Sequence, residues 1–321
     1  MNRLKRIALT GLAALTMSLG AAKGLEAATL RVPSQYSTIQ SAIDAASDGD
    51  EVLVAPGTYY DHPVMPNISL TLKSESGPED TIFGDSGGEY IPWRIVIPNG
   101  IDSNRNFTID GFSFKYNYGI SIGSPVTVIV RNNIMKDSAG CIGLANGGHV
   151  DIIGNYLDSW RRNIGIDRGT ANIYNNLIKN VFGDGIYIGT SDPVDIRNNT
   201  FIGYESGARA ITNGNPTTTF SNNIFQNLRN TGGYIVSPDI TNLGCNDFYI
   251  DNTVSIPNLH PTDIKDNPLF CDSNNNDYKL HSNSPCLPEN NSCGLIGALG
   301  VGCVTTPTKK TSWGELKVKY R

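Results

Sequence analysis

The sequence predicts an all-β protein built as a parallel β-helix, in which the chain winds in coils of three short strands. An apolar run, a pair of polar turn residues and a second apolar run recur six times between Val126 and Asp247. The second residue of each pair recurs every 21 to 24 residues, at Asn133, Asn155, Asn176, Asn199, Asn223 and Asn246. Another set of short apolar segments, including CIGL, NIGI and GIYI, follows with the same period. Such a period is typical of repeat architectures, and runs this short form strands rather than helices.

The paired turn residues suggest how the coils would stack. Neighbouring coils would lie ~4.8 Å apart, the ordinary spacing of paired strands. Asparagine tolerates the left-handed conformation that a sharp turn needs, and its side-chain amide can bond to the asparagines above and below it. We therefore expect the asparagine column to stabilise the fold and not to form a site.

The N-terminal residues 1–27 have the features of a secretory signal peptide. Basic residues precede an apolar run over residues 7–19, and small residues lead to a cleavage site near Ala27 or Ala28. No other segment has the ~18 continuous apolar residues of a transmembrane helix. We expect an exported monomer without a transmembrane segment, either secreted or held at the cell surface.

Charge argues against nucleic acid as a partner. The formal net charge is -5, and removal of the predicted signal peptide, with its four bases and one acid, changes it to -8. Binding to nucleic acid depends on neutralising phosphates with basic residues. An acidic exported protein is a poor candidate for that role.

A short amphipathic helix is predicted ahead of the first coil. Ser37 and Gln40 have the spacing of a capping box. The strand Glu51–Ala55 follows, after Asp48 and Gly49 end the helix. The apolar positions that share one face of the helix are Ile39, Ala42, Ile43 and Ala46. Such a helix would cover the apolar core at the open end of a solenoid.

The first segment of the chain and its last one carry a family resemblance. VPSQYSTIQSAIDAASDGDEVLVAPGTY, the asparagine-pair repeats and the closing NPLFCDSNNNDYKLHSNSPCLPENNSCGLIGALGVGC resemble the secreted right-handed parallel β-helix proteins of the pectin-lyase-like superfamily. The resemblance spans Thr29 to Cys303 and implies a single-stranded right-handed parallel β-helix over residues 28–303. Residues 304–321 would be a linker and a short basic tail. The resemblance is specific for the fold but not for an activity, because the superfamily includes lyases, hydrolases and epimerases.

The resemblance also implies where a substrate groove would lie. Family members commonly form it on the strand that corresponds to residues 163–166 and on the loops before that strand. Alternation predicts that Ile164 and Ile166 point inward, whereas Asn163 points outward. We expect Trp160, Arg162, Arg168 and Tyr187 to bind substrate, and Asp167, Asp184 and Arg209 to be catalytic.

Two classes of function stay open. The first is binding, and cleavage, of extracellular acidic polysaccharide. A lyase needs arginine or bound Ca²⁺ at the uronate carboxylate together with a base, whereas a hydrolase needs two opposed carboxylates. The signature motifs of polygalacturonases, classical pectate lyases and alginate epimerases are missing here. The second class is therefore a non-catalytic structural or adhesive solenoid.

Histidine spacing indicates no metal site, and Ca²⁺ is the one cofactor kept open. His149 in GGHVD precedes an asparagine turn and would lie away from the groove. The segment Glu89–Arg94 interrupts the repeat and is interpreted as a loop that leaves the coil. Its Trp93 could stack on a sugar ring, but burial of the indole is the favoured interpretation.

Six cysteines in an exported chain suggest disulfides. Cys141 occupies an interior strand position and should pack as a small apolar side chain. The other five lie in the last quarter of the chain, where Cys293 could pair with Cys286 or with Cys303. The sequence leaves the connectivity open. We expect these cysteines to fasten the C-terminal closing segment.

Overall fold

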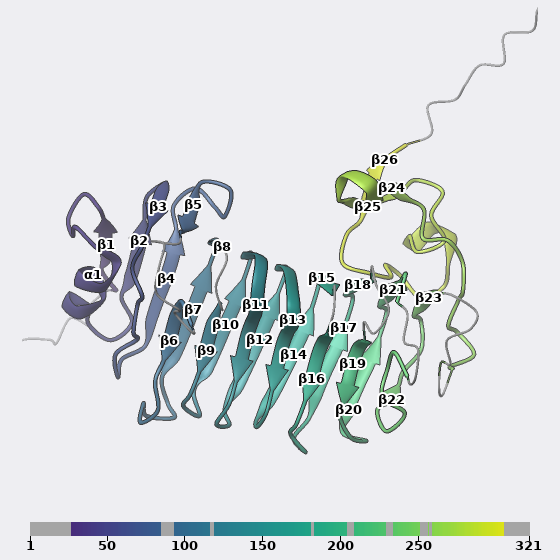
Figure 1. Ribbon diagram of the computed structural model, residues 1–321, viewed down its shortest axis with the longest axis horizontal. Coiled ribbons are helices and arrows are strands. Elements are labelled where there is room, and N and C mark those ends of the chain that lie inside the picture. The colour runs from purple at the N-terminus through teal and green to yellow at the C-terminus, as the bar shows by residue number, and fades with distance from the viewer. Residues whose placement is uncertain are drawn as a thin grey trace, which may run out of the picture.

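The computed structural model describes residues 27–84, 93–115, 119–180, 183–203, 209–228, 234–250, 256 and 259–304. Nearly all of the predicted signal peptide and tail lie outside these ranges. The described chain forms an elongated β-solenoid with a small helix at its N-terminal end and a folded-back segment near its C-terminal end (Figure 1). Within the described residues, no helix is long and apolar enough to cross a membrane.

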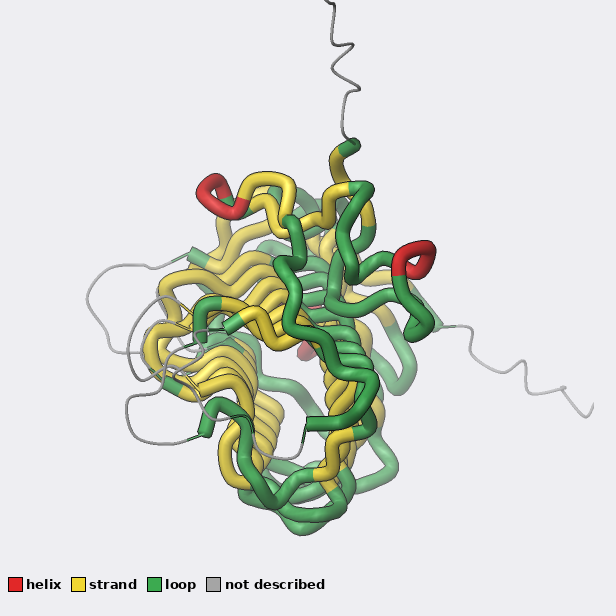
Figure 2. The backbone as a smooth tube through the Cα atoms, turned by 90° about the vertical axis from the view of Figure 1, so that its right-hand side faces the viewer, coloured by secondary structure: helices red, strands yellow, loops and turns green. Residues whose placement is uncertain are grey.

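The strands form three lanes that run along the solenoid, and Figure 2 shows successive coils stacked behind one another. The first lane contains β1 (Thr29–Val32), β2 (Glu51–Val54), β4 (Leu70–Ser74), β7 (Asn106–Asp110), β10 (Thr127–Arg131), β12 (His149–Ile153), β14 (Thr170–Tyr174), β17 (Val194–Arg197), β20 (Thr218–Ser221) and β22 (Thr241–Asn242). The second contains β3 (Gly57–Tyr59), β5 (Thr81–Phe83), β8 (Ser113–Lys115), β11 (Ile134–Leu144), β13 (Tyr156–Ile166), β15 (Leu177–Asn180), β18 (Thr200–Gly203), β21 (Ile224–Gln226) and β23 (Asp247–Tyr249).

The third lane contains β6 (Ile95–Ile97), β9 (Ile120–Ile122), the C-terminal halves of β11 and β13, β16 (Asp184–Ile188) and β19 (Arg209–Asn213). The 11-residue strands β11 and β13 join the second lane to the third. Every pairing along the three lanes is parallel and links a strand to its counterpart one coil away, as in Val128↔Val150. The predicted coil of three strands is confirmed.

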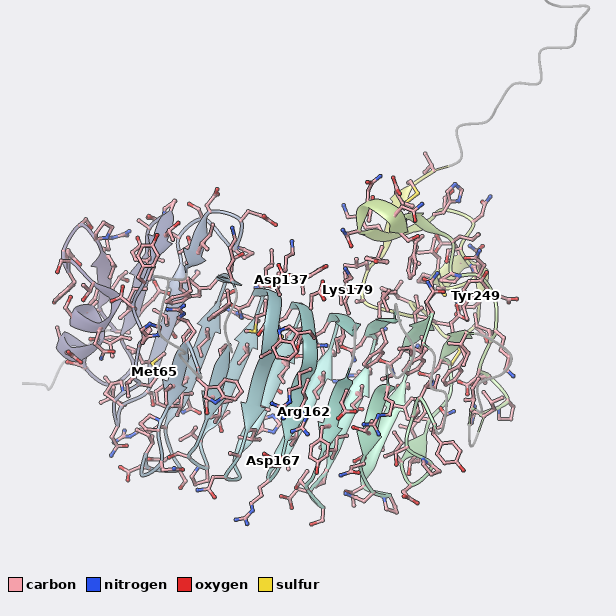
Figure 3. All side chains as sticks on the ribbon, viewed as in Figure 1. Met65, Asp137, Arg162, Asp167, Lys179 and Tyr249 are labelled. Carbon is pink, nitrogen blue, oxygen red and sulfur yellow. A yellow bond between two sulfur atoms is a disulfide. The ribbon has the colours of Figure 1, made fainter. Side chains whose placement is uncertain are left out.

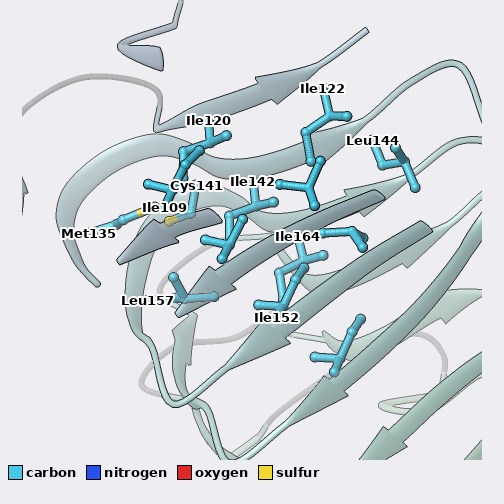
Figure 4. Packing of buried hydrophobic residues seen from close by; sticks show 14 of the residues in the cluster. Ile109, Ile120, Ile122, Met135, Cys141, Ile142, Leu144, Ile152, Leu157 and Ile164 are labelled. Carbon is cyan, nitrogen blue, oxygen red and sulfur yellow. The ribbon is translucent and has the colours of Figure 1, made fainter. Parts of the chain in front are cut away.

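One continuous apolar core fills the inside of the solenoid. Alternating residues point inward along each strand, so Ile152 and Ile173 stack in the first lane while Ile142 and Ile164 stack in the third. Figure 4 shows this packing around Ile164. Cys141 is fully buried in the same core, as predicted. Each coil therefore adds to an existing apolar column, which is the basis of solenoid stability.

The two residues of each turn pair have different roles. The first has a left-handed backbone, with φ of 55° at Asn132 and 59° at Asn175. The second is buried and forms the ladder: the Nδ2 of Asn155 donates to the Oδ1 of Asn176 at 3.0 Å, and the Nδ2 of Asn176 donates to Asn199 at 3.0 Å. The predicted ladder is confirmed. The turn geometry belongs to the first residue of the pair, and the ladder belongs to the second.

The ladder has two distinct ends. At the N-terminal end, the Oδ1 of Asn133 accepts from the backbone N–H of Phe112 at 3.0 Å. At the C-terminal end, the carboxylate of Asp263 takes the place of the next asparagine. One oxygen accepts from the backbone N–H and the Nδ2 of Asn246, and the other accepts from the Nδ2 of Asn242 and the N–H of His260. The strongest acceptor therefore terminates the chain of amides.

The predicted capping helix is present as α1 (Ile39–Ala45), and the buried Ile39, Ala42 and Ile43 face the first coil. Its capping box is one residue later than predicted. Thr38 is the N-cap and accepts from the backbone N–H of Ser41, whose hydroxyl accepts from the N–H of Thr38. A serine hydroxyl therefore takes the role that was expected of the Gln40 amide.

The closing segment, residues 268–304, folds back along the second lane. It contains β24 (Phe270–Asp272), the 3₁₀ turns η1 (Ser273–Asn275) and η2 (Pro288–Asn290), β25 (Asp277–His281) and β26 (Val301–Cys303). Left-handed asparagines of the solenoid hold it in place, since Asn198 and Asn222 donate to the carbonyl of Leu295 at 2.7 and 3.4 Å. The half-buried amides of Asn198 and Asn222 thus have a second use as anchors.

Two disulfides fasten this segment, Cys245–Cys293 to the solenoid and Cys271–Cys303 within the segment. The fastening role expected of the five C-terminal cysteines is confirmed for four of them. Both pairings suggested for Cys293 are wrong, because its partner lies in the last asparagine turn. Cys286 is a buried free thiol instead.

Candidate functional site

A row of outward-facing positions on the third lane contains two adjacent glycines. Strand register aligns Ser121, Gly143, Gly165 and Tyr187 over four successive coils. A Cβ at Gly143 would lie 3.1 Å from the Trp93 ring, and a Cβ at Gly165 would lie 3.3 Å from the Cδ of Arg162. The missing side chains therefore leave a hollow that neighbouring side chains overhang.

This hollow is a cleft of about 220 Å³. Trp93 forms one wall from the segment just before β6, and Arg161 and Arg162 form the other. The remaining lining residues are Ala139, Gly140, Cys141, Ile142, Gly143, Gly165 and Asp167. Figure 3 shows Arg162 and Asp167 on this face of the solenoid.

Aromatic and charged neighbours hold the arginine wall in position. The guanidinium of Arg162 lies 4.0 Å from the ring centroid of Tyr187 on the next coil. A cation–π contact of this kind restrains the arginine without removing its charge. Strand register aligns Arg162 with Asp184 on the next coil and Asp184 with Arg209 on the one after. The Nη2 of Arg209 lies 2.8 Å from the Asp184 carboxylate. Three successive coils therefore carry positive, negative and positive side chains.

The structure brings some of the predicted site residues together and separates others. Arg162 and Asp167 line the cleft, and Tyr187 supports Arg162. Asp184 is only 13% exposed and is engaged by Arg209, so this pair lies next to the cleft instead of lining it. The remaining candidates, Trp160 and Arg168, are exposed and do not line it. Tyr204 and Glu205, in the loops expected to flank the groove, lie outside the described residues.

Asn163 points inward, contrary to prediction. It is fully buried, donates to the carbonyl of Lys179 at 2.7 Å and accepts from the thiol of Cys141 at 3.4 Å. Ile164 and Ile166 are buried as expected. The register of β11 against β13 shifts where these strands turn from the second lane into the third. Simple alternation therefore fails at that bend.

Sequence reasoning missed the main elements of the cleft. Trp93 was expected to be buried, but it is half-buried and forms a wall. The sequence prediction placed neither Gly143 nor Gly165 in a site. Their signal was present, because CIGL and NIGI place a glycine at the outward position between two inward isoleucine or leucine side chains. His149 lies on the first lane, where it contacts Asp151 and Thr170, away from the cleft as predicted.

The lining residues favour binding over hydrolysis. Asp167 is the one carboxylate among the lining residues that the structure describes, and a glycosidase needs two. An indole face and guanidinium groups beside a side-chain-free floor suit a flat, hydroxylated or anionic ring. Among the described residues, no group of three histidine, cysteine, aspartate or glutamate side chains could hold a metal ion.

The fold and the cleft define a parallel β-helix protein with a ligand-sized hollow on an outer lane. Residues 100–248 match the family model described as a right handed beta helix region. The predicted right-handed parallel β-helix is thereby confirmed, together with its resemblance to that class of protein.

No curated protein has a significantly similar sequence. Among solved structures, the chain is similar to a mutant of the PL6 family alginate lyase AlyGC, with 15% identity and a TM-score of 0.26 over 85% of this chain and 58% of that one. It is also similar to AlyGC itself, with 13% identity and a TM-score of 0.22 over 76% and 54%. The chain thus spans little more than half the length of these proteins. At these values the matches carry no information on activity.

Proposed function

We propose that this protein binds polysaccharide in the cleft between Trp93 and Arg162. The observation that supports this most is the glycine floor at Gly143 and Gly165, which opens a ring-sized space directly beside an indole and two guanidinium groups. Sugar rings stack their C–H faces on aromatic side chains, and arginine pairs with carboxylates. An acidic polysaccharide is therefore the preferred ligand.

The proposed place of action is outside the cell. Two disulfides are compatible with an oxidising compartment, where such bonds persist. The predicted signal peptide at residues 1–27 would deliver the β-helix, residues 28–303, to that compartment. A monomer released from the cell or held at its surface is the form we propose.

We propose further that the protein cleaves the bound polysaccharide, and that it does so as a lyase and not as a hydrolase. Arg161 and Arg162 would neutralise a uronate carboxylate, the step that a lyase needs before proton removal. Asp167 would either take part in that proton transfer or bind Ca²⁺ together with the substrate. Arg209 would act indirectly, by holding Asp184 beside Arg162.

The experiment measures binding and turnover on one set of substrates. Mature protein is mixed with polygalacturonate, alginate and chondroitin, with Ca²⁺ or with EDTA, and both the dissociation constant and the absorbance at 235 nm are followed. We expect Trp93→Ala and Gly143→Leu to abolish binding, whereas Trp160→Ala, a matched change outside the cleft, leaves it intact. Rising absorbance that Asp167→Ala and Arg162→Ala remove would establish a lyase. Absence of binding to any glycan would support the structural or adhesive solenoid instead.

A further inference from the structure

A second concave surface lies between the second lane and the closing segment. It has a volume of about 380 Å³. Its floor comes from Gly154–Tyr156, Asn175 and Leu177, and its roof from Asn275–Lys279 and Leu299. These parts are about a hundred residues apart in the chain, as the contact between Lys179 and Asn276 illustrates. The groove therefore exists only while the closing segment is docked.

Lysine side chains surround the aromatic ring in the floor. The Nζ of Lys136 lies 4.9 Å from the ring centroid of Tyr156, and that of Lys179 lies 6.0 Å from it. Lys179 joins the floor to the roof, because its Nζ lies 3.1 Å from Asp158 and 3.0 Å from the Oδ1 of Asn276. Figure 3 shows Lys179 beside the overhanging closing segment.

The lysines continue along the solenoid. Lys115 pairs in register with Lys136 one coil further towards the N-terminus, and Lys279 contributes from the roof. The described acidic side chains in this region are Asp137, Asp158, Asp272 and Asp277. Asp158 is engaged by Lys179, and Asp272 accepts from the side-chain amide of Asn275 at 2.7 Å. Four lysines and four carboxylates therefore balance, but Lys115 and Lys136 lie together on adjacent coils. An anion is drawn to lysines grouped in this way on a chain whose net charge is -5.

Amide groups complete the groove. Asn175, Asn275 and Asn276 are exposed and line it, so they offer donors and acceptors to hydroxyl groups. Lysines spaced one coil apart suit a ligand with repeated charges that lies along the solenoid axis. A compact anion would use only one of these positions.

We propose that this groove is a second binding site, for a segment of an anionic glycan whose charges are carboxylates or sulfates. It is separate from the cleft on the third lane and would hold the polymer on a different face of the solenoid. Lys136 and Lys279 would pair with the charged groups, while the asparagine amides would bond to hydroxyls. Lys179 would keep the closing segment in place over the ligand.

The test uses three polymers in affinity electrophoresis of the mature protein. Polygalacturonate carries carboxylates, dextran sulfate carries sulfates, and dextran is the neutral counterpart. We expect retention by one or both anionic polymers and none by dextran. The double variant Lys136→Ala/Lys279→Ala should raise the dissociation constant on the order of tenfold at low salt. Lys73→Ala, which removes an exposed lysine of β4 on the first lane, should leave it unchanged.

Two further variants separate this groove from the cleft and from misfolding. Asn175→Gly keeps the left-handed backbone and removes only the amide, so it should weaken binding without lowering the melting temperature. In the Gly143→Leu background, where the cleft is closed, retention through the groove should persist. Equal binding by the double lysine variant and the wild type, equal retention by dextran, or no retention by either anionic polymer would overturn the proposal.

Discussion

At the scale of single residues, the two members of each turn pair have different structural roles, although the sequence shows similar residues at both positions. The first residue adopts the left-handed turn, and the second is buried in a chain of side-chain amides. A substitution should therefore be costly at the second position of a pair and nearly neutral at the first. Asn176 illustrates the buried role, since it accepts from Asn155 and donates to Asn199 and to the carbonyl of Ile152.

We expect Asn176→Ala to lower the free energy of unfolding by roughly 2–4 kcal/mol, because it leaves several buried polar groups without partners. Asn175→Gly is the matched control and should change it by only a few tenths, since glycine accepts a φ of 59° at no steric cost. Urea unfolding followed by fluorescence measures both. Equal losses at the two positions would contradict the division of roles.

The arginine wall of the cleft leads to a second prediction at this scale. Arg162 combines charge with a planar group stacked on Tyr187. Arg162→Lys keeps the charge and loses the planar stacking, so it should weaken glycan binding by less than Arg162→Ala, which loses both. We expect losses of about threefold and about tenfold, respectively. Isothermal titration with the glycan that the wild type binds measures them, and identical losses would show that stacking alone matters.

Residue types predicted the ladder well and the site only partly. The ladder positions repeat six times, so each copy supports the others. The cleft depends on single contacts, such as the one that Trp93 makes with Gly143 from the segment before β6, two coils away. Periodicity contains no information about such a contact. Arg162 and Asp167 could be predicted because they lie within β13 and directly after it, on the strand that contains Gly165.

At the scale of the elements, the fold followed from pattern except where strands bend. The helix α1, the strand β2 and the three lanes were predictable because burial on one side fixes the period. The long strands β11 and β13 turn a corner without a loop, and their register shifts there. This corner explains why Asn163 lies inside and why Trp160 lies away from the cleft.

The closing segment is an element whose attachment depends on covalent bonds. Cys245 and Cys293 are 48 residues apart, and a loop of this length contributes up to about 4 kcal/mol in a chain-entropy model. Cys245→Ser/Cys293→Ser should therefore loosen the closing segment selectively. Hydrogen exchange should speed up in residues 268–304, whereas the central coils keep their protection. Uniform acceleration along the whole chain would show that the segment is not a separate unit.

At the scale of the whole molecule, one buried carboxyl couples stability to pH. Asp247 lies under the closing segment, fully buried, and accepts from the Cys286 thiol at 3.2 Å. Burial, opposed in part by this thiol and increased by the nearby Asp266, raises the pKa of Asp247 to about 7. An unfolded aspartate has a pKa of about 3.9. The folded state therefore binds this proton more tightly than the unfolded state does.

The contribution of Asp247 to stability should be complete below about pH 4, decline as the pH rises, and be lost above about pH 7. Its full size is at most about 4 kcal/mol, because the folded and unfolded pKa values differ by roughly three. Melting temperatures between pH 4 and pH 8 measure it. Asp247→Asn should flatten this profile, whereas Asp239→Asn, a change at an exposed position, should not. A wild-type profile that rises over the same range would contradict the assignment.

The carboxylate of Asp263 at the end of the amide ladder has a consequence for the evolution of the molecule's length. Every internal step of the ladder is equivalent, so duplication of a unit such as residues 156–176 could insert another coil without creating an unmatched hydrogen bond. The terminal step is different, because the carboxylate of Asp263 accepts hydrogen bonds but has no N–H group that could donate one to a further coil. Tandem duplication could therefore add coils in the middle of the solenoid but not at this end, where Asp263 terminates the repeat.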